Sequence, residues 1–76
     1  MLVRFSGQRL RMARKQKKIS QAEFADRSGT TIRYVGSLER GEKENPSAAL
    51  VCQFSLVLEV PMEELMETRA ESEEQS

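Results

Sequence analysis

Apolar residues recur at helical spacing in several short segments of this 76-residue chain. Leu10 and Ala13 are three residues apart near the N-terminus, and Val35 and Leu38 repeat this spacing near the middle. Residues three or four apart share one face of an α-helix, so the pattern indicates amphipathic helices rather than strands. We therefore expect an all-α fold with one modest core.

The first helix is expected to begin after Ser6. A serine here can cap the helix with its hydroxyl, and Phe5 is placed to contact Leu10 across the cap. The helix should run to about Lys17.

The second helix has the most clearly marked start. Ser20 and Glu23 have the spacing of a capping box, and Ile19 and Phe24 occupy the two positions of a hydrophobic staple. Gly29 is suited to the left-handed conformation just beyond a helix end. A short helix from Ser20 to this glycine is predicted.

Three more helices are expected in the rest of the chain. Thr31 can cap the third, which Gly41 closes, and residues 42–46 form a polar loop. Residues 47–58 predict a fourth helix that is apolar on nearly every side. Pro61 suits the first position of a fifth.

Charge is unevenly distributed, although the net charge is zero. Residues 1–20 contain seven basic side chains and no acid, whereas residues 59–76 contain seven acids and one arginine. The basic end can meet phosphate and the acidic end cannot. We expect a domain over residues 1–68 and an acidic, disordered tail over residues 69–76.

The composition argues against several classes of function. With one cysteine and no histidine, the chain offers no internal disulfide and no Cys/His zinc site, so we expect no metal and no cofactor. A nucleophile beside a base and a glycine-rich phosphate loop are also missing from the sequence, so we expect no enzyme. The longest apolar run, residues 48–52, is far too short to span a membrane, and no signal peptide is recognisable. A cytoplasmic protein is expected, with Cys52 buried in its core.

Residues 21–40 have the spacing of two short helices joined by a tight turn. Ala25 is small enough for a steep crossing, and Gly29 permits the turn. Val35 and Leu38 can close the joint from beneath. The outer face of the second of these helices would then be free to enter a major groove of DNA.

With this motif, residues 5–66 resemble the Cro/repressor family of helix-turn-helix domains, also called the XRE family. The residues that carry the resemblance follow one another in register: Arg14, Ile19, Ser20, Gln21, Ala25, Gly29, Val35, Leu38, Glu39, Arg40, Gly41, Asn45, Pro46, Ser47, Glu63, Glu64 and Leu65. Two stretches are also similar to controller proteins of restriction-modification systems: Arg33-Tyr34-Val35 and Leu38-Glu39-Arg40-Gly41. Ser28 and Thr30 depart from the family, which usually has apolar residues there, so the turn is expected to be less well sealed.

The resemblance implies a five-helix, lambda-repressor-like domain that acts as a sequence-specific transcriptional regulator. Such a protein would bind double-stranded DNA at a short, roughly palindromic operator as a homodimer, with the third helix in the major groove. The alternative is a protein-interaction module of the antitoxin type, in which DNA binding is secondary. The acidic segment after Thr68 lacks the hydrophobic anchors that would hold such a partner.

Carried over by position, the resemblance also implies roles for individual residues. Base contacts are expected from the start of the third helix: Thr31, Ile32, Arg33 and Ser37. Phosphate contacts are expected from residues around it: Gln21, Tyr34, Arg40 and Lys43. For Arg33 the alternative is a phosphate contact or a solvated side chain, and for the phosphate-contacting set it is a solvated side chain.

Two further sets of residues are expected to have structural roles. Arg14 and Glu39 occupy positions that the family joins by an internal ion pair. Four apolar side chains on the last two helices would leave an exposed patch on a monomer, so we expect them at a dimer interface: Leu50, Leu56, Met62 and Met66.

Overall fold

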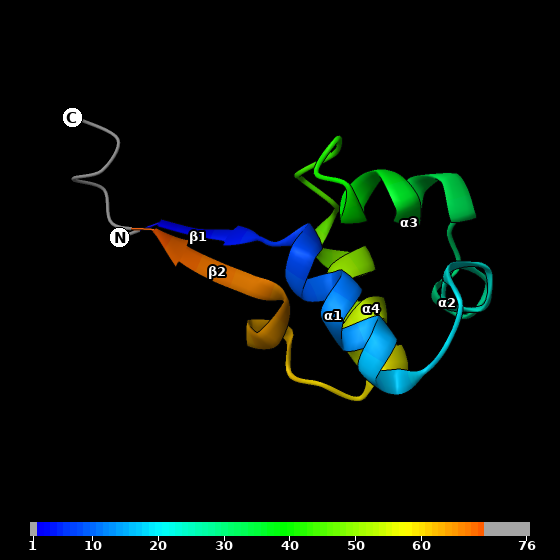
Figure 1. Cartoon of the computed structure of the whole chain (residues 1–76). Coiled ribbons are helices and arrows are strands. Elements are labelled where there is room, and N and C mark those ends of the chain that lie inside the picture. Colours follow the sequence, from blue (N-terminus) through cyan, green and yellow to red (C-terminus); the bar gives the residue numbers. More distant parts are fainter. Residues whose placement is uncertain (1, 70–76) are drawn as a thin grey trace.

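The computed structural model describes residues 2–69 (Figure 1). Within this range the chain forms four α-helices, a turn of 3₁₀-helix and a two-stranded sheet. In chain order the elements are β1 (Leu2–Phe5), α1 (Gly7–Lys17), α2 (Gln21–Ser28), α3 (Ile32–Glu39), α4 (Ala48–Leu58), η1 (Met62–Leu65) and β2 (Met66–Arg69). The sheet projects from one side of the helical part of the molecule, and α3 lies along an outer edge of that helical part.

Local capping explains where the helices begin. Before each of the four helices, a side-chain hydroxyl accepts the backbone N–H of the residue three positions on, as expected for an N-cap. These caps are Ser6, Ser20, Thr31 and Ser47. Gly29 follows α2 with a φ of 79°, the left-handed conformation predicted for the turn. The predicted boundaries of these four helices are therefore confirmed.

The segment after Pro61 differs from the predicted fifth helix. It makes one 3₁₀ turn and then runs antiparallel to β1, with Phe5 opposite Met66. The N–H of Ser6 donates to the carbonyl of Leu65 at 2.9 Å, which brings the two segments together. Backbone groups that a helix would have paired internally are paired with β1 instead, so the all-α, five-helix prediction is wrong in this part.

The predicted end of the domain is one residue short of the last element. The prediction placed Arg69 in the tail, but it lies in β2. Residues 70–76, where the rest of the acidic tail was expected, lie outside the described residues.

The core forms where the helices and the sheet meet. Phe54 of α4 lies at its centre, with its ring centroid 4.9 Å from that of Phe24 and 6.4 Å from that of Phe5. Val51 and Leu58 share the buried face of α4. Cys52 is exposed, because it follows Val51 by one position and is rotated out of that face, so the prediction of a buried cysteine is wrong.

Gly7 sets how closely α1 approaches α3. A Cβ atom at this position would lie 1.8 Å from the carbonyl oxygen of Leu38, far inside van der Waals contact. Only glycine allows the start of α1 to rest against the backbone of α3. α3 is thus packed against α1 as well as α2.

Candidate nucleic-acid interface

The steep crossing of α2 and α3 exposes one side of α3. Ala25 is buried at the joint, and Val35 and Leu38 are fully buried beneath it. Thr31 and Arg33, on the other side of the first turn, are exposed, and Ile32 is 52% exposed. Three of the four residues expected to contact bases therefore lie on the exposed surface at the start of α3, and Ser37 is the exception.

Ser37 lies beneath that surface. It is only 7% exposed, and its hydroxyl donates to the carbonyl of Tyr34 at 2.7 Å. Its own carbonyl accepts the backbone N–H groups of Glu42 and Lys43 at 2.9 and 3.2 Å. The backbone hydrogen bonds of Ser37 therefore join α3 to the following loop.

A surface groove runs beside α3 and the loop that follows it. Its lining residues come from both segments: Thr31, Arg33, Tyr34, Ser37, Arg40, Glu42 and Lys43. Tyr34 is half-buried and packs against the core. Three of the four side chains expected to contact phosphates lie in this groove, and Gln21 lies apart, at the start of α2.

The Arg40 guanidinium is paired with a neighbouring acid. Its Nε and Nη2 donate to the two carboxylate oxygens of Glu42 at 2.9 and 3.2 Å. These hydrogen bonds lower the pKa of Glu42, and both side chains are exposed. Arg40 would have to leave this carboxylate to bind a phosphate, and nothing in the sequence pattern pointed to this pair.

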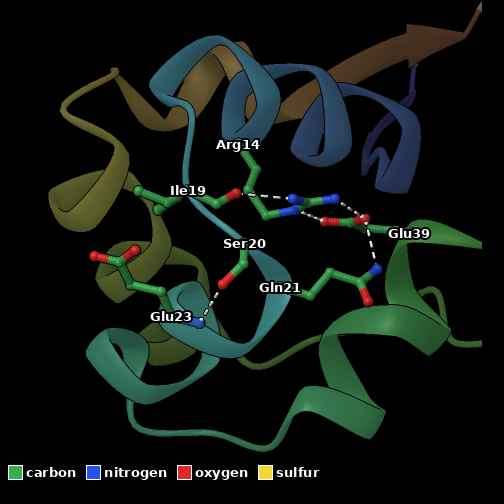
Figure 2. Close-up of polar contacts among 6 residues, drawn as sticks. All are labelled: Arg14, Ile19, Ser20, Gln21, Glu23 and Glu39. Atoms are coloured by element: carbon green, nitrogen blue, oxygen red, sulfur yellow. Dashed lines mark hydrogen bonds and ion pairs between the residues drawn. The ribbon is translucent and has the colours of Figure 1, made fainter.

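Arg14 and Glu39 form the ion pair that was expected, and it joins α1 to the last residue of α3 (Figure 2). Nε and Nη2 of Arg14 donate to the two carboxylate oxygens at 2.7 and 3.0 Å, and Nη1 donates to the carbonyl of Ile19 at 2.9 Å. The Arg14 and Glu39 side chains are only 10% and 2% exposed.

The same carboxylate also binds Gln21, the first residue of α2. Nε2 of Gln21 donates to Oε1 of Glu39 at 3.0 Å. Burial alone would raise the pKa of Glu39, but hydrogen bonds from Arg14 and Gln21 and the charges of Arg14 and Arg11 outweigh it, so the pKa is lowered. Glu39 stays ionised and links three helices. Sequence reasoning missed its contact with Gln21.

Comparison with known proteins places this arrangement in a family. A family model described as Helix-turn-helix matches residues 10–65, which include α2, the turn and α3. The chain belongs to this helix-turn-helix family, in its XRE-type branch.

Known helix-turn-helix proteins resemble the chain in both sequence and structure. The restriction-modification controller protein C.AhdI from Aeromonas hydrophila is 39% identical, with a TM-score of 0.73 over 78% of this chain and 88% of that one. The biofilm master regulator SinR, solved in complex with DNA, is 38% identical, with a TM-score of 0.71 over 74% of this chain and 89% of that one.

A curated relative covers more of the chain than the chain covers of it. The HTH-type transcriptional regulator SinR of Bacillus subtilis is 36% identical over 67 residues, which are 88% of this chain and 60% of the relative. The chain thus spans about three fifths of that protein's length.

A second surface of this helix-turn-helix domain lies on α4, which has no charged residue. Of the side chains expected at a dimer interface, Leu56 is 65% exposed and Met62 is 37% exposed, whereas Leu50 and Met66 pack partly against the core. Three further exposed residues continue the Leu56 face: Ala49, Cys52 and Gln53. We call Ala49, Cys52, Gln53 and Leu56 the uncharged α4 face; their helical spacing could have revealed it in the sequence.

Residues 2–69 contain neither a candidate membrane-spanning helix nor a candidate metal site. No helix there combines the length and apolar character that crossing a bilayer requires. Nor does this range contain a cluster of three or more acidic, cysteine or histidine side chains placed to hold a metal ion.

Proposed function

We propose that this helix-turn-helix protein is a transcriptional regulator that binds a short, roughly palindromic operator as a homodimer, with α3 in the major groove. The observation that carries the proposal is the exposed first turn of α3, a helix whose last residue, Glu39, binds side chains of α1 and α2. Binding of DNA by the SinR relative supports it. The basic, acid-free α1 adds charge that attracts phosphates.

Sequence would be recognised through the first turn of α3. The Arg33 guanidinium can donate two hydrogen bonds to O6 and N7 of guanine, while Ile32 and the methyl group of Thr31 can contact a thymine methyl. Ser37 would contribute through its small size, which lets the helix approach the base edges closely. These contacts define specificity in the proposal.

Phosphate contacts would come from both ends of the motif. Gln21 stands at the start of α2, where backbone N–H groups and the helix dipole favour anions. Tyr34, Arg40 and Lys43 border the groove beside α3. These contacts would fix the orientation of the protein without selecting sequence.

The dimer would form through the uncharged α4 face, together with Met62. Two copies can bring such a face together around a two-fold axis without like-charge repulsion. Leu50 and Met66 would support it from below, because both are partly covered by the core. The two α3 helices would then lie in successive major grooves, one helical turn apart.

Selection of bound duplexes from a random DNA pool tests the proposal. We expect enrichment of one sequence with two related half-sites whose centres lie about 10 base pairs apart. A pool that stays random after repeated rounds would contradict it.

A narrower proposal, supported by the likeness to C.AhdI, is that the protein controls a restriction-modification system. It requires the selected sequence to occur upstream of the genes for such a system.

A further inference from the structure

We infer that Glu39 is a positioning residue for DNA binding: its carboxylate holds the side chain of Gln21 in place for a phosphate contact. The inference rests on the proposed DNA-binding function. It gives Glu39 a role beyond its ion pair with Arg14, because the carboxylate acts on a residue at the proposed interface.

The hydrogen bonds of Glu39 support this second role. Oε2 accepts Nε of Arg14 at 2.7 Å, and Oε1 accepts both Nη2 of Arg14 and Nε2 of Gln21 at 3.0 Å. The two bonds from Arg14 are enough for a forked ion pair, so the bond from Gln21 is an addition from a different helix. Figure 2 shows Arg14 and Gln21 reaching the carboxylate from different sides.

The buried carboxylate also determines which end of the Gln21 amide faces it. A carboxylate only accepts hydrogen bonds, so the NH₂ group of Gln21 must turn toward Glu39 and the carbonyl oxygen must turn away. One N–H is used in this bond, and the second is left to donate elsewhere. The side chain is thereby oriented before any DNA is bound.

This orientation matters because Gln21 begins α2. The first N–H groups of a helix have no hydrogen-bond acceptor within the helix. A phosphate near Gln21 would therefore meet these N–H groups together with the oriented side-chain amide. A glutamine that is already held loses less rotamer freedom when the phosphate arrives. Since Glu39 is the last residue of α3, the phosphate contact and the base-contacting helix are also held in one relative position.

A double-mutant cycle separates positioning from a merely structural role. Glu39→Gln replaces two charged acceptor oxygens with one neutral acceptor and one NH₂ donor, so Arg14 and Gln21 compete for the remaining oxygen and the bond to Gln21 is weakened. We expect Glu39→Gln and Gln21→Ala each to weaken binding to a mixed-sequence duplex by about three- to tenfold, as the loss of one pre-ordered side chain implies. The double variant should bind no more weakly than the weaker single variant.

The comparison uses temperatures at which circular dichroism shows all four proteins folded. Gln16→Ala serves as the control, because Gln16 is an exposed glutamine that lines a different surface hollow, to which α3 contributes no residue. It should change the affinity less than twofold. If Glu39→Gln weakens binding equally with and without Gln21, its role is structural and the inference is wrong. If the unmodified protein binds no duplex, the proposed function fails as well.

A measurement on the unmodified protein keeps the inference testable if Glu39→Gln does not fold. Nuclear spin relaxation of the Gln21 side-chain amide should give an order parameter near that of rigid backbone, about 0.85, before DNA is added. A value below about 0.6 would show a mobile side chain and would overturn the inference. The exposed amide of Gln16 provides the mobile reference.

Discussion

Replacing Glu39 with alanine leaves the Arg14 guanidinium without its carboxylate in a site that is 10% exposed. Breaking a buried pair by removing one partner costs about 3–5 kcal/mol, because the remaining charge is uncompensated. A chain of this size has a total stability of about 4–11 kcal/mol. The substitution should therefore remove a large part of that stability.

Thermal unfolding followed by circular dichroism measures this loss. For a domain of 60–100 residues, 1 kcal/mol shifts the Tm by about 4–8 °C, so Glu39→Ala should lower it by at least about 12 °C. Glu42→Ala is the matched control, since it removes a carboxylate that pairs with an exposed arginine. Equal decreases in the two variants would refute the reasoning, because the Arg14 pair would then behave as a surface contact.

The pH dependence provides a second check on the same pair. The pKa of Glu39 is lower in the folded state than its ordinary value of about 4.3, so its contribution to stability is complete above that value. The contribution is lost as the pH falls through the lower, folded-state pKa. The stability difference between the unmodified protein and Glu39→Ala should be largest near pH 7 and should shrink below about pH 4. A difference independent of pH would contradict the charge argument.

Three further predictions concern other parts of the molecule. Ser28→Ala should raise the free energy of unfolding by about 1 kcal/mol, because the buried hydroxyl of Ser28 has no hydrogen-bond partner within the described residues. A lower free energy of unfolding for the variant, measured with denaturant, would contradict this. Lys43→Ala should reduce the slope of the logarithm of the DNA-binding constant against the logarithm of the salt concentration by about 0.9 per half-site, without changing the preferred sequence. An unchanged slope would show that Lys43 does not contact a phosphate. Leu56→Lys should give a folded monomer with weaker operator binding, because Leu56 is exposed on the proposed dimer interface. Sedimentation of the unmodified protein at tens of micromolar, roughly the dissociation constant of a weak interface, would contradict the dimer model by finding only monomer.

Features set by neighbouring residues could be predicted from the sequence. The hydroxyl of Ser20 caps α2 by binding the N–H of Glu23, three residues on, and Gly29 adopts its positive φ just beyond the same helix. Both depend on a few consecutive residues, which is why the helix boundaries were predictable. The ion pair of Arg14 with Glu39 was expected only through the family resemblance.

Features set by distant residues could not be predicted in the same way. Pro61 and the acids after it are suited to a helix, but β2 forms because β1 lies beside it, and the paired residues Phe5 and Met66 are far apart in the chain. The burial of Ser37 and the exposure of Cys52 depend on how each helix is rotated against its neighbours. An apolar pattern on all sides of α4 does not specify that rotation.

We propose that the first turn of α3 recognises sequence in the major groove, and Arg33 tests this proposal most directly. Operators that carry each of the four base pairs at the position nearest Arg33 are measured with the unmodified protein and with Arg33→Ala. We expect the variant to lose about 1–3 kcal/mol on the preferred operator and to lose its preference at that one base pair in each half-site. The same order of preference at uniformly lower affinity would contradict the claim and leave Arg33 with a phosphate contact.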